Sequence, residues 1–249
     1  MNTNWYFFDD EYDVFKYDRQ SLNGKDEREL RKRIQAKLLE LNTRLIVRLS
    51  MNKMDLHNHP NKKNITSLII PCDYNKGRVN WIGVRYGKSE KFLKLLNYGL
   101  AQNDSEDKLG FQKYACMQVD VGYSGVDVGI YHAVPHQALD RAYLHQNIDK
   151  LQKRLVKEIS CLKFKGYAWK IWNTEKQEEY VFDFDNRPAE EFIEWYKQYD
   201  EDGTYSSMLK HFPRYDMNIS AENIEGTCFD VISDLYKFYR VISWFPVTM

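Results

Sequence analysis

The chain contains a doubled tetrapeptide, in which Val119-Asp120-Val121-Gly122 is followed by Val126-Asp127-Val128-Gly129. Apolar and polar residues alternate through both copies, as they do in strands that bury one face. The short connection Tyr123-Ser124-Gly125 between the copies indicates a β-hairpin. A two-residue turn at Ser124-Gly125 gathers the valines on one face, whereas a three-residue turn would put one aspartate on each face. The sequence therefore predicts the two-residue turn.

In this register Val121 lies opposite Val128 and Asp120 opposite Gly129, so that Asp120 and Asp127 are diagonal neighbours about 6–8 Å apart. Two carboxylates at such a spacing are typical of a divalent-cation site or of a general acid/base pair. Each copy ends in glycine, which within a strand often marks the close approach of another group. The alternative is that both aspartates are solvated on an open face. Asp120 and Asp127 are the candidate catalytic and metal-binding residues.

The wider hydrophobic pattern predicts an α+β fold. Strands come in neighbouring hairpins rather than singly between helices, which favours an antiparallel or mixed sheet of about six strands with about five helices packed on it. Residues 1–20 have no clean period and are expected to form an irregular arm. We expect one domain over residues 1–249, with an appended acidic lobe at 173–249 as the alternative. Helices are predicted at 26–50, 89–101, 137–161, after Pro188 and at 220–244, and strands at 66–72, 78–86, 119–123, 126–130, 166–172 and 179–184.

Charge is distributed unevenly along the chain, although the formal net charge is zero. Residues 25–94 contain 17 Lys and Arg against 7 Asp and Glu, whereas residues 173–235 contain 5 against 16. Such asymmetry indicates a surface that attracts an anion, of which nucleic acid is the common case. It is equally consistent with two segments that face and neutralise each other within the fold.

A basic cluster with interleaved aromatic residues falls within the first of these segments. Cations beside exposed rings are what contact with a phosphate backbone and stacking on bases require. Strand alternation puts Trp81 on the side of Arg85 and away from Ile82, Val84 and Tyr86, so we expect Trp81 to be the less buried ring. The alternative is an ordinary solvated face with Trp81 in the core. The candidate nucleic-acid-binding residues are Lys76, Arg78, Trp81, Arg85, Lys88 and Lys91.

A second metal candidate is the string Asp55-Leu56-His57-Asn58-His59-Pro60. On an extended segment Asp55, His57 and His59 point the same way. The string resembles the Asp-x-His-x-His opening of amidohydrolase and polymerase-histidinol-phosphatase metal sites, and the resemblance covers these six residues only. It implies Asp55, His57 and His59 as weaker candidate metal ligands. The alternative is a loop with surface histidines. His132 is expected to be a satisfied core histidine.

The four cysteines are scattered without Cys-x-x-Cys spacing, which favours a reduced, cytoplasmic protein over a zinc ribbon. No apolar run is long enough to span a membrane, and we expect no membrane partner. The chain has neither a Walker-type loop nor a Gly-x-Gly-x-x-Gly motif, so ATP and dinucleotide use have no sequence support.

Two hypotheses follow for the function. The first is a nucleic-acid-associated protein, and more specifically a metal-dependent phosphodiesterase or nuclease in which Asp120 and Asp127 hold a divalent cation. The second is a non-catalytic module for protein binding, assembly or self-association, which would suit the aromatic faces and the opposite charges. Whether the protein is an enzyme is left open by the sequence.

Overall fold

The structure is a computed structural model of the whole chain. It describes residues 4–20, 24–58, 66–68, 78–93, 114–132, 138–201 and 203–245. The chain divides into two compact units of interleaved segments. Unit 1 comprises Met1–Lys91, Gln118–Val128 and His211–Val231, and unit 2 comprises Phe92–Met117, Gly129–Lys210 and Ile232–Met249. The single domain expected from the sequence, with its alternative lobe at 173–249, stays a prediction.

The α+β class predicted from the sequence is confirmed. The described strands form one sheet with the order β1-β3-β4-β5-β8-β6-β7, and β2 also pairs with β3. The pairs β1–β3, β2–β3, β6–β7 and β6–β8 are antiparallel. The strands are β1 (His57–Asn58), β2 (Thr66–Leu68), β3 (Trp81–Gly87), β4 (Cys116–Gly122), β5 (Gly125–His132), β6 (Ala168–Asn173), β7 (Glu178–Asp183) and β8 (Thr204–Pro213).

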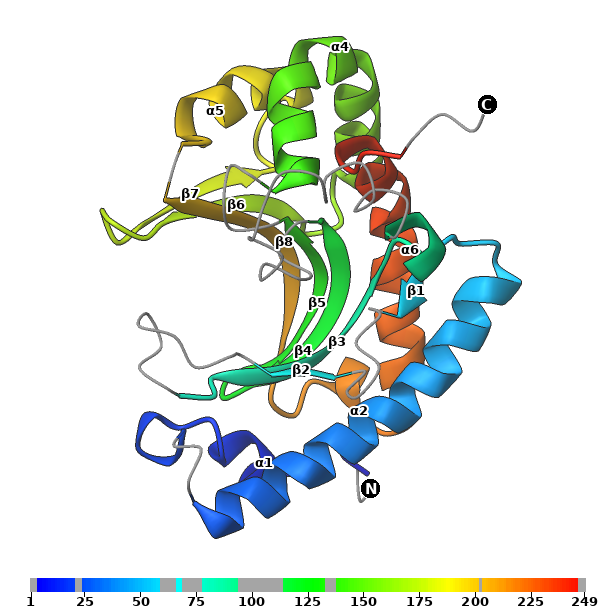
Figure 1. Cartoon of the computed structure of the whole chain (residues 1–249), viewed down its shortest axis with the longest axis vertical. Coiled ribbons are helices and arrows are strands. Elements are labelled where there is room, and N and C mark those ends of the chain that lie inside the picture. The colour runs from blue at the N-terminus through cyan, green and yellow to red at the C-terminus, as the bar shows by residue number, and fades with distance from the viewer. Residues whose placement is uncertain are drawn as a thin grey trace. The chain divides into compact units, whose positions relative to one another are not determined.

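In unit 1 the long helix α2 (Lys25–Met51) agrees closely with its predicted span. Ile34, Leu38, Leu41 and Leu45 are fully buried at helical spacing, and this face packs against β3. The predicted irregular arm is wrong. It contains the helix α1 (Asp9–Asp13), which packs beside α2 (Figure 1), and a 3₁₀ turn at Tyr17–Arg19. Its apolar residues belong to the core, where Phe7, Tyr12, Val14 and Phe15 are buried.

The hairpin of the doubled tetrapeptide forms, but its predicted turn is wrong by one residue. β4 ends at Gly122 and β5 begins at Gly125, so the connection is Tyr123-Ser124. Shifting a turn by one residue changes the pairing by two, and an even change leaves every side chain on its face. All four valines are accordingly fully buried, as predicted: Val119, Val121, Val126 and Val128.

Strand β8 was missed by the sequence patterns. Its inward positions are the buried residues Thr204, Ser206 and Met208, whereas Tyr205 and Leu209 point outward and are half-buried. The usual alternation of apolar and polar residues is therefore absent from this strand. The omission matters because β8 ends in unit 1 at His211, Phe212 and Pro213.

In unit 2 the predicted hairpin of β6 and β7 is confirmed, with Trp169 opposite Phe182 and Ile171 opposite Tyr180. Trp169 is fully buried and meets the rings of Phe192 and Phe238. Helices α4 (Leu139–Leu162) and α5 (Phe192–Tyr199) lie side by side (Figure 1). The last helix is α6 (Ile224–Ile242), and a 3₁₀ turn at Ala189–Glu191 precedes α5. Among the described residues, no helix is both long enough and apolar enough to cross a membrane.

Candidate functional site

Asp120 on β4 is a buried carboxyl with unusual surroundings. Only 5 % of the residue is exposed, and within the described part of the chain no hydrogen-bond partner reaches its Oδ1 atom. Burial disfavours the charged carboxylate and raises the pKa of Asp120 to about 8. The guanidinium of Arg85 opposes this effect, while the carboxylate of Asp127 reinforces it. Asp120 is therefore largely protonated at neutral pH and can donate a proton or a hydrogen bond.

Arg85 of β3 lies on the same face of the sheet as Asp120, and its charge acts on the Asp120 carboxyl. Its guanidinium donates from Nε to Oε1 of Gln118 over 3.3 Å and lies 4.7 Å from the centre of the Trp81 ring. Along β3, Trp81 and Arg85 alternate with Ile82, Val84 and Tyr86, which are fully buried on the other side of the strand. Trp81 is half-buried, so the prediction that it is the less buried ring is confirmed.

Asp127 on β5 pairs with a histidine that the sequence patterns did not single out. Its Oδ1 atom lies 2.9 Å from Nδ1 of His211 on β8. Both side chains reach solvent, with exposed fractions of 33 % for Asp127 and 41 % for His211. A carboxylate beside Nδ1 favours the tautomer that carries its proton there, which leaves Nε2 free to accept one. No motif linked the two residues, because β8 itself was not predicted.

The observed connection also changes how the two aspartates are paired. A two-residue connection pairs Gly122 with Gly125, and counting back along both strands then brings Asp120 opposite Asp127. The effect of Asp127 on the pKa of Asp120 agrees with this proximity. The two carboxyls share one face, as predicted, and by this count they are directly opposite rather than diagonal.

Gly122 and Gly129 were expected to mark a close approach, and of these two only Gly129 does, while Gly125 in the connection region does so as well. A Cβ atom at Gly129 would lie 2.0 Å from the carbonyl oxygen of Met208. One at Gly125 would lie 2.1 Å from the carbonyl oxygen of Phe212. In each case the approaching group is the main chain of β8. These glycines therefore serve the packing of strands.

The basic cluster does not form one exposed cationic face. Arg85 and Lys88 are buried, whereas Lys91 is exposed. Arg78 packs on a ring 3.5 Å from the centre of Tyr17. Lys76 lies outside the described residues. Contact with a nucleic-acid backbone through this cluster therefore gains no support.

The basic helix α2 is neutralised in part within unit 1. Arg44 lies 3.7 Å from Glu225, and Arg48 lies 4.0 Å from both Glu225 and Asp230. Near the middle of α2, Lys37 contacts the buried carboxylate of Glu11. Residues of the basic and acidic segments thus meet within the fold, which was one of the two explanations that the sequence left open.

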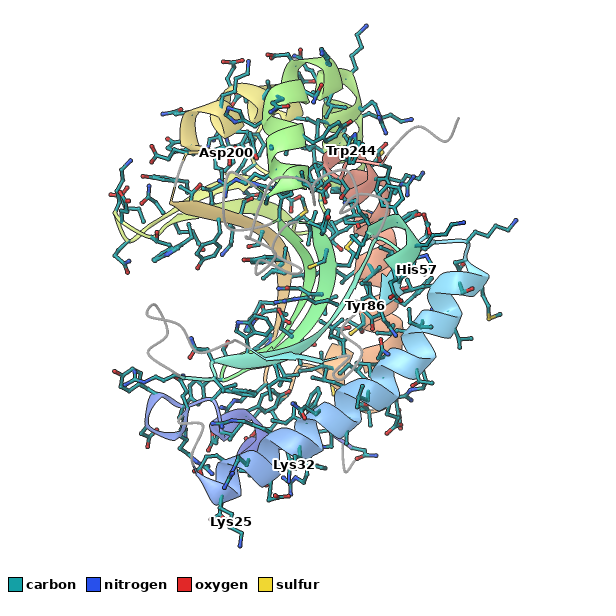
Figure 2. All side chains as sticks on the ribbon, in the orientation of Figure 1. Lys25, Lys32, His57, Tyr86, Asp200 and Trp244 are labelled. Atoms are coloured by element: carbon teal, nitrogen blue, oxygen red, sulfur yellow. The ribbon has the colours of Figure 1, made fainter. Side chains whose placement is uncertain are left out.

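The second metal candidate is only partly described. His57 lies on β1, which pairs with β3 near Tyr86; both residues are labelled in Figure 2. Nε2 of His57 is 2.8 Å from Oδ1 of Asp55, and both side chains are exposed. His59 lies outside the described residues. In the part of the chain that the structure describes, no group of three or more His, Cys, Asp and Glu side chains is arranged to hold a metal ion.

The burial predicted for His132 is confirmed. The side chain is fully buried, and its Nδ1 atom lies 3.2 Å from Oγ of Ser206. Its ring meets that of Trp169 edge to face. His132 is thus a core histidine of unit 2 with a hydrogen bond at Nδ1, but within the described residues no hydrogen bond reaches its Nε2 atom, so only the core position predicted for it is confirmed.

Comparison with known proteins adds nothing to this geometry. No protein-family model matches the chain, and no curated protein has a matching sequence.

Proposed function

We propose that unit 1 carries an acid–base catalytic site, in which Asp120 donates a proton and the Asp127–His211 pair accepts one. The observation that carries the proposal is that two carboxyls of one face have different environments. Asp120 is buried, without a hydrogen bond to its Oδ1 atom among the described residues, and its pKa is raised to about 8. Asp127 is partly exposed and bound to His211. Neighbouring titratable groups whose environments differ in this way are typical of acid–base assignments.

The roles follow from the chemistry of each group. Asp120 in its protonated form can protonate a leaving oxygen, a task that suits an acid whose pKa lies near the working pH. Nε2 of His211 can take a proton from an attacking hydroxyl or water, while Asp127 orients the ring and stabilises the imidazolium that forms. The two steps together would cleave an ester bond by addition of the attacking oxygen and departure of the protonated leaving oxygen.

We further propose a phosphodiester as the substrate class, which carries forward the association with nucleic acid inferred from the sequence. Two features support it. The positive charge of Arg85 acts on Asp120 and so lies where an anionic group would be stabilised. The half-buried Trp81 ring, beside that guanidinium, offers a surface on which a base could stack. A divalent cation held by Asp120 and Asp127 stays a prediction and would need further oxygen ligands.

The test is hydrolysis of bis(p-nitrophenyl) phosphate and of labelled RNA and DNA oligonucleotides, each with EDTA and with added Mg²⁺ or Mn²⁺. We expect turnover in EDTA that falls about 100-fold or more in Asp120→Asn, because general acid catalysis contributes on that scale. Asp149→Asn, a change at an exposed carboxylate of α4, is the matched control. Turnover that appears only with added metal would instead favour the metal-dependent mechanism.

The competing function is a binding module without catalysis. It would be favoured if none of these substrates is turned over under either condition while an oligonucleotide or a second copy of the chain still binds. Analytical ultracentrifugation with a labelled oligonucleotide separates these outcomes. Binding that persists in Asp120→Asn and His211→Ala would show that the proposed site does not take part in the interaction.

A further inference from the structure

Gly83 on β3 lies directly beneath the carboxyl of Asp120. A Cβ atom at Gly83 would lie 1.8 Å from Oδ1 and 2.9 Å from Cγ of Asp120. Real Cβ atoms do not approach other atoms so closely, so the Asp120 carboxyl occupies the space that a side chain at position 83 would need. The same Cβ would also lie 2.7 Å from the carbonyl oxygen of Val119, which is a main-chain atom.

Gly122 provides an internal comparison on the same face. It follows Asp120 by two residues on β4, so both point to one side of the sheet. A Cβ atom at Gly122 would meet the carbonyl oxygen of Asn80 at 3.6 Å and Cβ of Trp81 at 3.9 Å, which are ordinary contacts. The requirement for glycine is therefore particular to position 83 within this pair.

We infer that Gly83 is a positioning residue for Asp120, because the absence of a side chain there lets the carboxyl lie buried against β3. This inference deepens the proposed function, since it names what holds the proton donor in place. The backbone conformation at position 83 does not require glycine. The requirement comes from the space that a Cβ atom would need, which the Asp120 carboxyl occupies. A methyl group at position 83 would push the carboxyl off β3 and toward solvent.

The charged groups around Asp120 predict the consequence of such a displacement. Arg85 approaches from β3 and Asp127 from β5, with His211 of β8 bound to Asp127. Desolvation is the largest influence on Asp120, and it raises the pKa. A carboxyl moved toward water loses much of that influence, so its pKa should fall toward the ordinary value of an aspartate.

The test is the pKa of Asp120 measured by carbon-detected NMR of the carboxyl in the full chain, for wild type, Gly83→Ala and Gly122→Ala. We expect wild type and Gly122→Ala to titrate near 8, and Gly83→Ala to titrate lower by about one pH unit or more. An unchanged titration in a folded Gly83→Ala variant would overturn the inference. The measurement needs no substrate, so its result is independent of whether the protein has the proposed activity.

A double-mutant cycle keeps the inference testable if Gly83→Ala does not fold. Urea unfolding is compared for Gly83→Ala in the wild-type background and in Asp120→Ala, which lacks the carboxyl. We expect the methyl group to cost markedly less stability in Asp120→Ala, or to allow folding only there. An equal loss in both backgrounds would assign the clash to the carbonyl of Val119 and would overturn the role of Gly83 in positioning Asp120.

Discussion

Nδ1 of His211 lies 2.9 Å from Oδ1 of Asp127, although the two residues are 84 positions apart in the chain. The contact depends on β8, which runs beside β5 in the sheet. Gly125 on β5 allows β8 to lie this close, because its missing side chain leaves room for the carbonyl of Phe212, the residue next to His211. The hairpin thus supplies an aspartate for the site and a glycine that allows its partner strand to approach.

The Asp127–His211 pair gives the first prediction. His211→Ala should reduce phosphodiester hydrolysis by about 100-fold or more, because it removes the proton acceptor. Asp127→Asn should reduce it less, since the imidazole remains and only its orientation and tautomer are disturbed. The double variant should be no worse than His211→Ala alone, because the two residues act as one unit. Losses that simply multiply would contradict a shared role.

Asp120 gives a prediction for the dependence of stability on pH. Its pKa is about 8 in the folded protein and about 3.9 in an unfolded chain, so the folded state binds the proton more tightly. The stabilisation from this group is fully present below about pH 4 and is lost as the pH rises through 8. Over that interval the free energy of unfolding should fall by about 1.4 kcal/mol per pH unit from this group.

Urea unfolding at several pH values between 5 and 9 measures this slope. The isosteric variant Asp120→Asn cannot ionise and should show a flatter dependence than wild type. Asp127→Asn should keep the downward slope, although the midpoint of the Asp120 titration should move lower, because a neighbouring negative charge is lost. A wild-type protein whose stability is level across this range would contradict a raised pKa at Asp120.

The limits of the sequence patterns are clearest at the hairpin. Alternation assigned every valine and aspartate to the correct face, because within each strand the face changes with every residue. It did not fix the turn, because Tyr123-Ser124 and Ser124-Gly125 both separate the faces correctly. The turn that forms lets the carbonyl of Phe212 approach Gly125, a long-range contact that no local pattern records.

The candidate site was predicted in part for the same reason. Asp120 and Asp127 could be paired from local alternation, but His211 could not, since the inward positions of β8 are Thr204, Ser206 and Met208 rather than an apolar series. The burial of Arg85 was also missed. A basic residue in a basic segment was expected to be solvated, whereas Gln118 and Trp81 provide it with polar and aromatic partners inside the fold.

The glycines of the hairpin give a prediction about stability. Gly129→Ala should be strongly destabilising, because its Cβ would lie 2.0 Å from the carbonyl oxygen of Met208, a main-chain atom that cannot turn aside. Gly122→Ala should leave the protein folded, since its nearest neighbours lie at ordinary contact distances. Thermal unfolding followed by circular dichroism compares the two. Equal melting temperatures for the two variants would show that β8 shifts easily, and would contradict a packing role for Gly129.

The last prediction concerns the buried ion pair of unit 2, in which Arg141 of α4 meets Asp200 at the end of α5 (Asp200 is labelled in Figure 2). Nε of Arg141 donates to Oδ1 of Asp200 over 2.7 Å, and the guanidinium also contacts Thr204 at the start of β8. Both charged side chains are fully buried. Asp200→Ala would leave the guanidinium buried without this carboxylate and should cost about 3–5 kcal/mol of unfolding free energy.

The exposed pair of Lys197 and Asp149 is the matched control for that measurement. Its ions lie 2.7 Å apart, as close as Nε of Arg141 lies to Asp200, but both side chains reach solvent. Asp149→Ala should therefore leave urea unfolding unchanged within error, because water replaces the lost partner. Similar losses in Asp149→Ala and Asp200→Ala would mean that burial does not distinguish the two pairs. A large loss confined to Asp200→Ala would identify Arg141–Asp200 as a stabilising connection between α4 and the end of α5.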